Sequence, residues 1–319
     1  MEKIDMEKPK IDKLIRDFEN TKYFGYMFFV EYDGQKFESF DENPNKKSVK
    51  SDFRKILENN KIKIFKGIQQ AGRTDANVSA KENILYINSK EIIAFSKLKF
   101  LETEGMKINK IARTLPFLEF PQMIEKRYYI YEYPKKLRKN NEERINKICK
   151  KVSGKKDFYE FTSEKGKKLK NHTREIFVKY ENGKLYFVGD GFLPQQVRIM
   201  SNFILNNTKF DIEKLNDGNF ENRKLGIKDK PLDGKYLTLM KVDFSEKLGK
   251  ISFFDVKNIE ELINLKKNNN ENLETRNSEI KIDDLNEQLK SIDKVRKIER
   301  NSYFTVFFVE KKDKGEFIG

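Results

Sequence analysis

Hydrophobic and polar positions along residues 23–104 predict alternating strands and helices. Residues 23–32 (YFGYMFFVEY) form an aromatic run that ends at Asp33-Gly34, as expected for a buried strand followed by a turn. Shorter apolar or alternating runs predict two more strands, at residues 61–68 and 82–88. Helical spacing of apolar positions predicts helices at residues 46–60 and 90–104. The predicted order is therefore β-α-β-loop-β-α.

A similar series of elements begins again near residue 125. Strands are predicted at residues 126–133, 173–180, 184–192 and 236–244, and helices at residues 140–152 and 193–207. Glu181-Asn182-Gly183 separates two of these strands and is a strong hairpin signal, because Asn and Gly accept the positive φ of a tight turn.

The repeated series predicts an α+β protein. We expect two ferredoxin-like or RRM-like halves that form a mostly antiparallel mixed sheet with helices on one face, plus a small C-terminal extension. The expected domains are residues 1–113, residues 114–245 and an extension at residues 246–319. Within the extension, residues 266–279 are polar and of low complexity, which is typical of a linker. A helix at residues 282–298 and a strand at residues 302–312 are predicted after it.

Composition adds a positive charge to this picture. The 319 residues carry 66 Lys and Arg against 51 Asp and Glu, a net charge of +15. Residues 251–319 hold 13 basic and 14 acidic residues, so the excess lies in the first 250. A polyanionic partner such as RNA would explain the excess. A general preference for Lys would explain it equally well, since only 13 of the 66 basic residues are Arg.

Single copies of Cys and His limit the possible chemistry. Cys149 cannot form a disulfide within the chain, which fits a cytoplasmic protein, and its helix-like context favours a buried thiol. With His172 as the one histidine, a zinc site or a Ser-His-Asp triad is very improbable. The N-terminus is too polar for a signal peptide, and no apolar run reaches membrane-spanning length. We therefore expect no metal, no cofactor and no membrane partner.

The loop Ala71-Gly72-Arg73-Thr74-Asp75-Ala76 is the most informative segment. Taken alone, a loop Asp beside an Arg is usually a turn residue in a solvated ion pair. However, residues 71–80 (AGRTDANVSA) resemble the catalytic loop of the TruA family of tRNA pseudouridine synthases, AGRTDAGVHA. Further segments resemble that family in the same order: YDGQKF at residues 32–37, KRYY at 126–129, DFYEFTS at 157–163, and GFLPQQVR at 191–198. The resemblance covers residues 22–245.

The resemblance implies a cofactor-free isomerisation of uridine to pseudouridine in the anticodon arm of tRNA, at positions 38–40. It assigns the catalytic carboxylate to Asp75, the active-site tyrosine to Tyr128 and an arginine that contacts the carboxylate to Arg198. Arg73 would assist base flipping, with Thr74 beside it as a substrate-binding residue. Contacts with tRNA phosphates are expected from Lys165, Lys167 and Lys168. A homodimer with tRNA across a basic cleft is also implied.

Each of these residues also has an ordinary structural interpretation. Tyr128 would ordinarily be a core tyrosine, Arg198 a surface charge and the lysines a solvated loop. The chain also departs from the family: Asn77 replaces Gly, Ser79 replaces His, residues 38–41 replace a G-W-Q segment, and an F-H-A-R-like piece is lacking. Two alternatives therefore stay open, a catalytically inactive or retargeted RNA-binding relative and a protein-interaction module.

Overall fold

The computed structural model describes residues 23–94, 97–114, 116, 120–215, 226–227 and 229–244, and the backbone of three short strands farther along the chain. The strands of the main sheet are β1 (Phe24–Tyr32), β2 (Phe65–Gln70), β3 (Ser79–Ser89), β4 (Met106–Thr114), β5 (Ile124–Tyr131), β6 (Gly154–Asp157), β7 (Thr173–Glu181), β8 (Lys184–Gly189), β9 (Leu237–Phe244) and β10 (Phe254–Asp255). The helices are α2 (Val49–Asn59), α3 (Glu142–Val152), α4 (Glu164–Lys167) and α5 (Gln196–Asn206).

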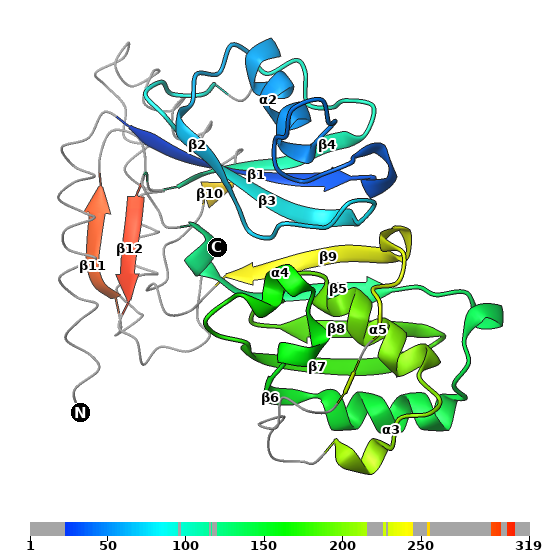
Figure 1. Cartoon of the computed structure of the whole chain (residues 1–319). Coiled ribbons are helices and arrows are strands. Elements are labelled where there is room, and N and C mark those ends of the chain that lie inside the picture. Colours follow the sequence, from blue (N-terminus) through cyan, green and yellow to red (C-terminus); the bar gives the residue numbers. More distant parts are fainter. Residues whose placement is uncertain are drawn as a thin grey trace, which may run out of the picture.

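These strands form one ten-stranded sheet (Figure 1). Its order is β10-β4-β1-β3-β9-β5-β8-β7-β6, and β2 pairs with β3 off this path. β3 and β9 run parallel over two residue pairs, while the other described pairs are antiparallel. The expected α+β class with a mixed, mostly antiparallel sheet is confirmed. The predicted domain limits at residues 113 and 245 stay predictions.

The strands β1 to β4 and α2, here called the N-terminal half, enclose an aromatic core. Ser48 and Ser51 exchange side-chain and main-chain hydrogen bonds at the start of α2, so this helix begins with a complete capping box. Its apolar face then packs on β1, where the rings of Phe53 and Phe28 meet edge to face with centroids 5.0 Å apart. Both side chains are fully buried.

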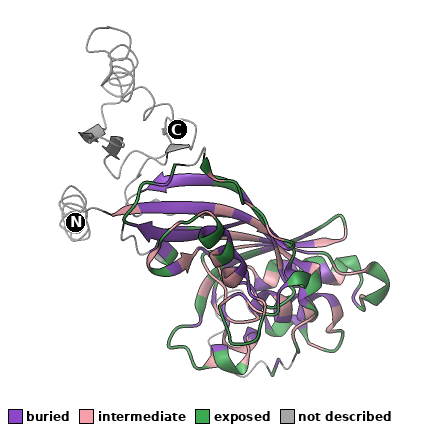
Figure 2. Ribbon diagram, turned by 90° about the horizontal axis from the view of Figure 1, so that it is seen from above, coloured by how far each residue is buried: buried purple, intermediate pink, exposed green. Residues whose placement is uncertain are grey.

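The elements from β5 to β9, here called the C-terminal half, follow the predicted pattern closely. Asn182 and Gly183 have φ values of 50° and 77° and join β7 to β8, as the hairpin signal indicates. Helices α3 and α5 pack on one face of these strands (Figure 1). Buried positions alternate with more exposed ones along β7 and β8, and the outer sides of the helices are exposed (Figure 2).

The helix predicted at residues 90–104 is wrong over the part that the structure describes, residues 90–94 and 97–104. The side chain of Asn60, just after α2, bonds the main-chain groups of this segment instead. Its Oδ1 accepts from the amides of Lys99 and Phe100, and its Nδ2 donates to the carbonyl of Phe100. The amide of Ile93 donates to the hydroxyl of Tyr26 at 3.0 Å. These tertiary bonds replace the helical ones, so local periodicity is overridden.

In the C-terminal extension the structure describes backbone only. Strands β11 (Val295–Arg300) and β12 (Thr305–Val309) pair antiparallel with each other. The strand predicted at residues 302–312 is thus confirmed, while the end of the helix predicted at residues 282–298 is a strand. The remainder of that helix and the linker predicted at residues 266–279 lie outside the described residues.

Candidate active site

Hydrogen bonds with buried polar groups hold the loop between β2 and β3 in place. Thr74 is only 8% exposed, and its hydroxyl lies 2.9 Å from that of Tyr32. The side-chain amide of Asn83 donates to the Tyr32 hydroxyl at 3.1 Å and to the carbonyl of Gly72 at 2.8 Å. Burial raises the pKa of Tyr32 to about 12, so this phenol stays protonated and available to donate. The network fixes the main chain that carries Asp75.

Two departures from the family loop are explained by the backbone. Asn77 has a φ of 65°, a left-handed conformation that Asn adopts more readily than most residues. The Ser79 hydroxyl accepts a hydrogen bond from the amide of Gly34 at 3.0 Å. A Cβ at Gly34 would collide with the main chain of Val78, so the turn after β1 and the loop that carries Asp75 touch through their backbones.

Replacing Gly34 with alanine is therefore expected to destabilise the protein by about 2 kcal/mol, since a rigid main chain cannot yield to the added methyl group. Gly67→Ala is the matched control, because a Cβ there meets nothing within 4 Å, and a change below about 0.5 kcal/mol is expected. Urea unfolding of both variants measures the difference. Equal stability of the two variants would contradict the close approach of these loops.

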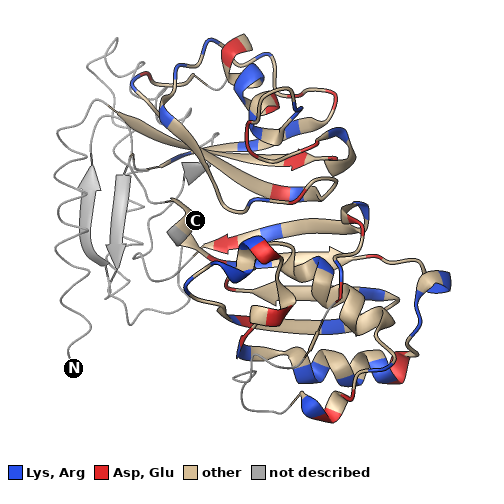
Figure 3. Cartoon of the chain, in the orientation of Figure 1, with Lys and Arg blue, Asp and Glu red and all other residues tan. Residues whose placement is uncertain are grey.

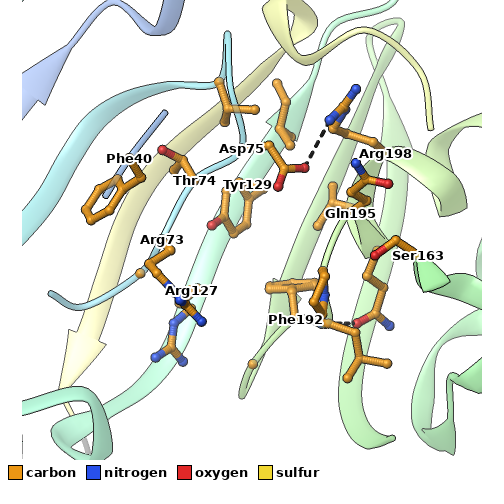
Figure 4. A pocket seen from close by; sticks show the side chains of 18 of the residues that line it. Phe40, Arg73, Thr74, Asp75, Arg127, Tyr129, Ser163, Phe192, Gln195 and Arg198 are labelled. Atoms are coloured by element: carbon orange, nitrogen blue, oxygen red, sulfur yellow. Dashed lines mark hydrogen bonds and ion pairs between the residues drawn. The ribbon is translucent and has the colours of Figure 1, made fainter. Parts of the chain in front are cut away.

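Asp75 meets Arg198 across the two halves of the sheet. The Nη1 atom of Arg198 lies 3.1 Å from Oδ2 of Asp75, and its Nε donates to the carbonyl of Leu232 at 2.6 Å. The side chains of Asp75 and Arg198 are 34% and 15% exposed. The carboxylate is thus held in one orientation but remains open to an incoming ligand (Figure 4).

A cavity of about 1110 Å³ surrounds this ion pair. Its wall combines residues of both halves, including Phe40, Arg73, Tyr129, Lys165 and Gln195. The volume is sufficient for a nucleotide with its neighbours. Figure 4 shows Tyr129 and Gln195 on either side of the ion pair, with Arg73 farther out.

The structure does not bring Tyr128 to this cavity, so the assignment of the active-site tyrosine needs correction. The Tyr128 hydroxyl donates to Oδ2 of Asp243 at 2.5 Å, and this bond raises the pKa of Tyr128 to about 12. Tyr129 lines the cavity and is 7% exposed. The family pattern has a basic residue two positions before its tyrosine. In KRYY we assign that basic residue to Arg127 rather than Lys126, which makes the tyrosine Tyr129 rather than Tyr128. A shift of one position in a strand moves a side chain to the opposite face of the sheet.

Tyr129 occupies a largely apolar position beside the loop. Its ring meets that of Phe192 edge to face, with centroids 5.3 Å apart, and its hydroxyl lies 3.9 Å from where a Cβ on Gly72 would stand. Burial is the main cause that raises the pKa of Tyr129 far above its ordinary value. This phenol therefore keeps its proton at neutral pH.

The remaining predicted site residues divide between the cavity and its surroundings. Arg73 lines the cavity with a 65% exposed side chain, and its Nη1 lies 3.5 Å from Oδ2 of Asp41, in the segment that replaces G-W-Q. Lys165 lines the cavity. Lys167 is not among the residues that line it and pairs with Glu164 at 2.7 Å. Lys168 is exposed at the end of α4. Thr74 also lines the cavity, but its hydroxyl is engaged by Tyr32.

Cys149 and His172 are both buried away from the Asp75 cavity. Burial raises the pKa of the Cys149 thiol to about 12, so it is an inert structural thiol. Nε2 of His172 lies 3.1 Å from the carbonyl of Gly166. Within the described ranges, no three or more His, Cys, Asp and Glu side chains gather as metal ligands, and no helix there has the length and apolar character to cross a membrane.

Comparisons with known proteins agree on one family. No family model matches the chain. The tRNA pseudouridine synthase A of Streptococcus uberis is 28% identical over 212 residues, which cover 56% of this chain and 82% of that protein. The enzyme of the same name from Streptococcus gordonii is 29% identical over 243 residues, covering 66% and 92%. A 60-residue stretch is 47% identical to the Picrophilus torridus protein of that name and covers 19% and 23%. The chain is thus similar to these tRNA pseudouridine synthases over 56–66% of its length, which agrees with its resemblance to the TruA family.

Proposed function

We propose that this chain isomerises uridine to pseudouridine in tRNA, with Asp75 as the catalytic carboxylate. The observation that carries the proposal is the ion pair between Asp75 and Arg198 inside a large cavity formed by both halves of the sheet. A solvated turn carboxylate would need neither an arginine from 123 positions later in the chain nor an enclosing wall.

The reaction breaks the N1–C1′ bond of uridine and forms a C5–C1′ bond. The uracil leaves, rotates and returns, C5 gives up its proton, and N1 gains one, so the atoms balance without a cofactor. An oriented carboxylate beside the ribose can attack C1′ or remove a proton from C2′. Arg198 aims the carboxylate by holding one oxygen and leaves the other, Oδ1, toward the cavity.

Tyr129 is the residue we propose to stack on the extruded uracil. A target base must leave its helix, which costs a few kcal/mol, and stacking on an aromatic ring returns about 1–3 kcal/mol per base. The Tyr129 ring borders the cavity, and its protonated hydroxyl can donate a hydrogen bond to the base.

Replacing each of the two neighbouring tyrosines separately tests this assignment. Tyr129→Leu is expected to lower the single-turnover rate of pseudouridine formation by about 10²-fold, because the flipped base loses its stacking partner. Tyr128→Phe is expected to change that rate less than threefold, since its hydroxyl bonds Asp243 and its ring lies off the cavity. A rate that depends on Tyr128 and not on Tyr129 would reverse the correction made above.

Basic side chains around the cavity are proposed to bind the RNA backbone. Arg73 needs only to leave its weak, exposed pair with Asp41 to reach a phosphate or the vacated base position. Lys and Arg lie on α2 of the N-terminal half and on α3 and α4 of the C-terminal half (Figure 3). Three of these basic residues belong to α4 and its C-cap: Lys165, Lys167 and Lys168. Affinity for tRNA that falls steeply with salt is expected, which a protein-interaction module would not show.

Target and assembly extend the proposal. We propose uridines 38–40 of the anticodon arm as targets, a cytoplasmic location and a homodimer, all by analogy with the family. A catalytically inactive RNA-binding relative is the competing function. Incubating the purified chain with unmodified tRNA and measuring pseudouridine separates the two, because an inactive relative would bind with the same salt dependence and form none.

A further inference from the structure

Arg127, on β5, makes three hydrogen bonds to main-chain carbonyls. Its Nε and Nη2 donate to the carbonyl of Ala71 at 3.1 and 2.8 Å, and its Nη1 donates to the carbonyl of Asp190 at 2.7 Å. Ala71 is the first residue of the catalytic loop, and Asp190 directly follows β8. One guanidinium therefore ties the loop of the N-terminal half to the segment that leads into α5.

That connection lies within the catalytic cavity. Arg127 lines its wall together with Tyr129, which stands two positions later on the same face of β5. A Cβ on Gly72 would lie 3.8 Å from Nε of Arg127 and 3.9 Å from the Tyr129 hydroxyl, so both side chains lie beside the loop (Figure 4). Any movement of Ala71 away from Arg127 also moves Asp75, four residues later, relative to Tyr129.

We propose that Arg127 is a positioning residue: it sets the place of Asp75 relative to Tyr129 and Arg198 by gripping the loop at Ala71. The inference rests on the proposed function. Near this point the sheet joins the two halves through two residue pairs between β3 and β9, Ser79 with Thr238 and Ala80 with Leu239, and the Arg198 ion pair links them across the cavity. Displacing a reacting group by about 1 Å can cost about 10²-fold in rate.

The shape of the side chain matters for this role. A guanidinium is a planar fork that can serve two carbonyls at once, with two of its nitrogens on the carbonyl of Ala71 and the third on that of Asp190. A lysine at position 127 keeps the positive charge but has a single nitrogen. Arg127→Lys should therefore restore little of the rate lost in Arg127→Ala.

Arg144 provides a matched control. It lies on α3, away from the cavity, and has the same pattern: Nε and Nη2 donate to the carbonyl of Asn207, and Nη2 also donates to that of Phe210. Arg144→Ala removes an equivalent structural arginine. Any general loss of stability should be similar in the two variants, whereas a positioning effect should occur only at Arg127.

The test compares wild type, Arg127→Ala, Arg127→Lys and Arg144→Ala in single-turnover kinetics on tRNA. For Arg127→Ala we expect a rate about 10²-fold lower, tRNA Kd within about threefold of wild type, and an unchanged slope of log K against log salt. Arg127→Lys should behave alike and Arg144→Ala like wild type. If instead Kd weakens and the salt slope falls by about one while the rate holds, Arg127 binds a phosphate and the proposal is wrong.

Hydrogen exchange of the loop gives a readout that does not depend on activity. Amides of residues 71–78 should exchange faster in Arg127→Ala than in wild type or Arg144→Ala, because the loop loses its anchor. If wild type fails to act on tRNA, the proposed function fails while this measurement still tests the anchor. Unchanged exchange would overturn the positioning role even in an active enzyme.

Discussion

Asp75→Asn is expected to reduce pseudouridine formation by at least about 10³-fold. Asparagine has nearly the same shape and can keep one hydrogen bond with Arg198, but it can neither attack C1′ nor take up a proton from the sugar. The measurement is release of tritium from tRNA labelled at uridine C5, because C5 loses its hydrogen when it bonds to C1′. Single-turnover conditions keep product release out of the measured rate.

The variant should remain folded and should bind tRNA within about threefold of wild type. The loop is held by Thr74, Tyr32 and Asn83, which the substitution does not touch. A rate above about a tenth of wild type would remove Asp75 from the catalytic role. A loss of rate that only follows a loss of tRNA affinity would favour a binding role for this carboxylate.

Arg198→Ala is expected to have the second largest effect, a fall of about 10²–10³-fold in rate. The truncation leaves Asp75 without its ion-pair partner and the carbonyl of Leu232 without its donor. The carboxylate then loses its fixed orientation, and the protein should lose about 1–2 kcal/mol of unfolding free energy. Kinetics and urea unfolding of the same preparation measure the two losses separately.

A double-mutant cycle shows whether Arg198 acts through Asp75. If it does, Asp75→Asn combined with Arg198→Ala should be hardly slower than Asp75→Asn alone, because the guanidinium has no carboxylate left to orient. Rates that multiply across the two changes would mean that Arg198 serves the reaction independently, for instance by contacting RNA directly.

Local patterns were sufficient for most of the fold. The strand at Phe24–Tyr32 and the helix at Val49–Asn59 follow from apolar periodicity, and the turn at Asn182-Gly183 follows from its residue types. The helix expected at residues 90–104 failed because its competitor, Asn60, lies some forty residues earlier. No window of local sequence contains that bond.

The site shows the same division. The loop that carries Asp75 and the segment that carries Arg198 were both found by residue pattern, but a pattern does not state which face of a strand a side chain takes. Consecutive tyrosines at positions 128 and 129 made the two registers of β5 equally acceptable in sequence, and only the sheet separates them. Arg127 was overlooked for a related reason, since its partners, Ala71 and Asp190, are 56 and 63 positions away.

Mapping pseudouridines in a single unmodified tRNA transcript after incubation with the purified chain tests the central claim most directly. Wild type should create pseudouridine within the anticodon arm, at uridines among positions 38–40, and Asp75→Asn at the same concentration should create none. A transcript that wild type binds in a salt-dependent manner but leaves without any pseudouridine would contradict the account.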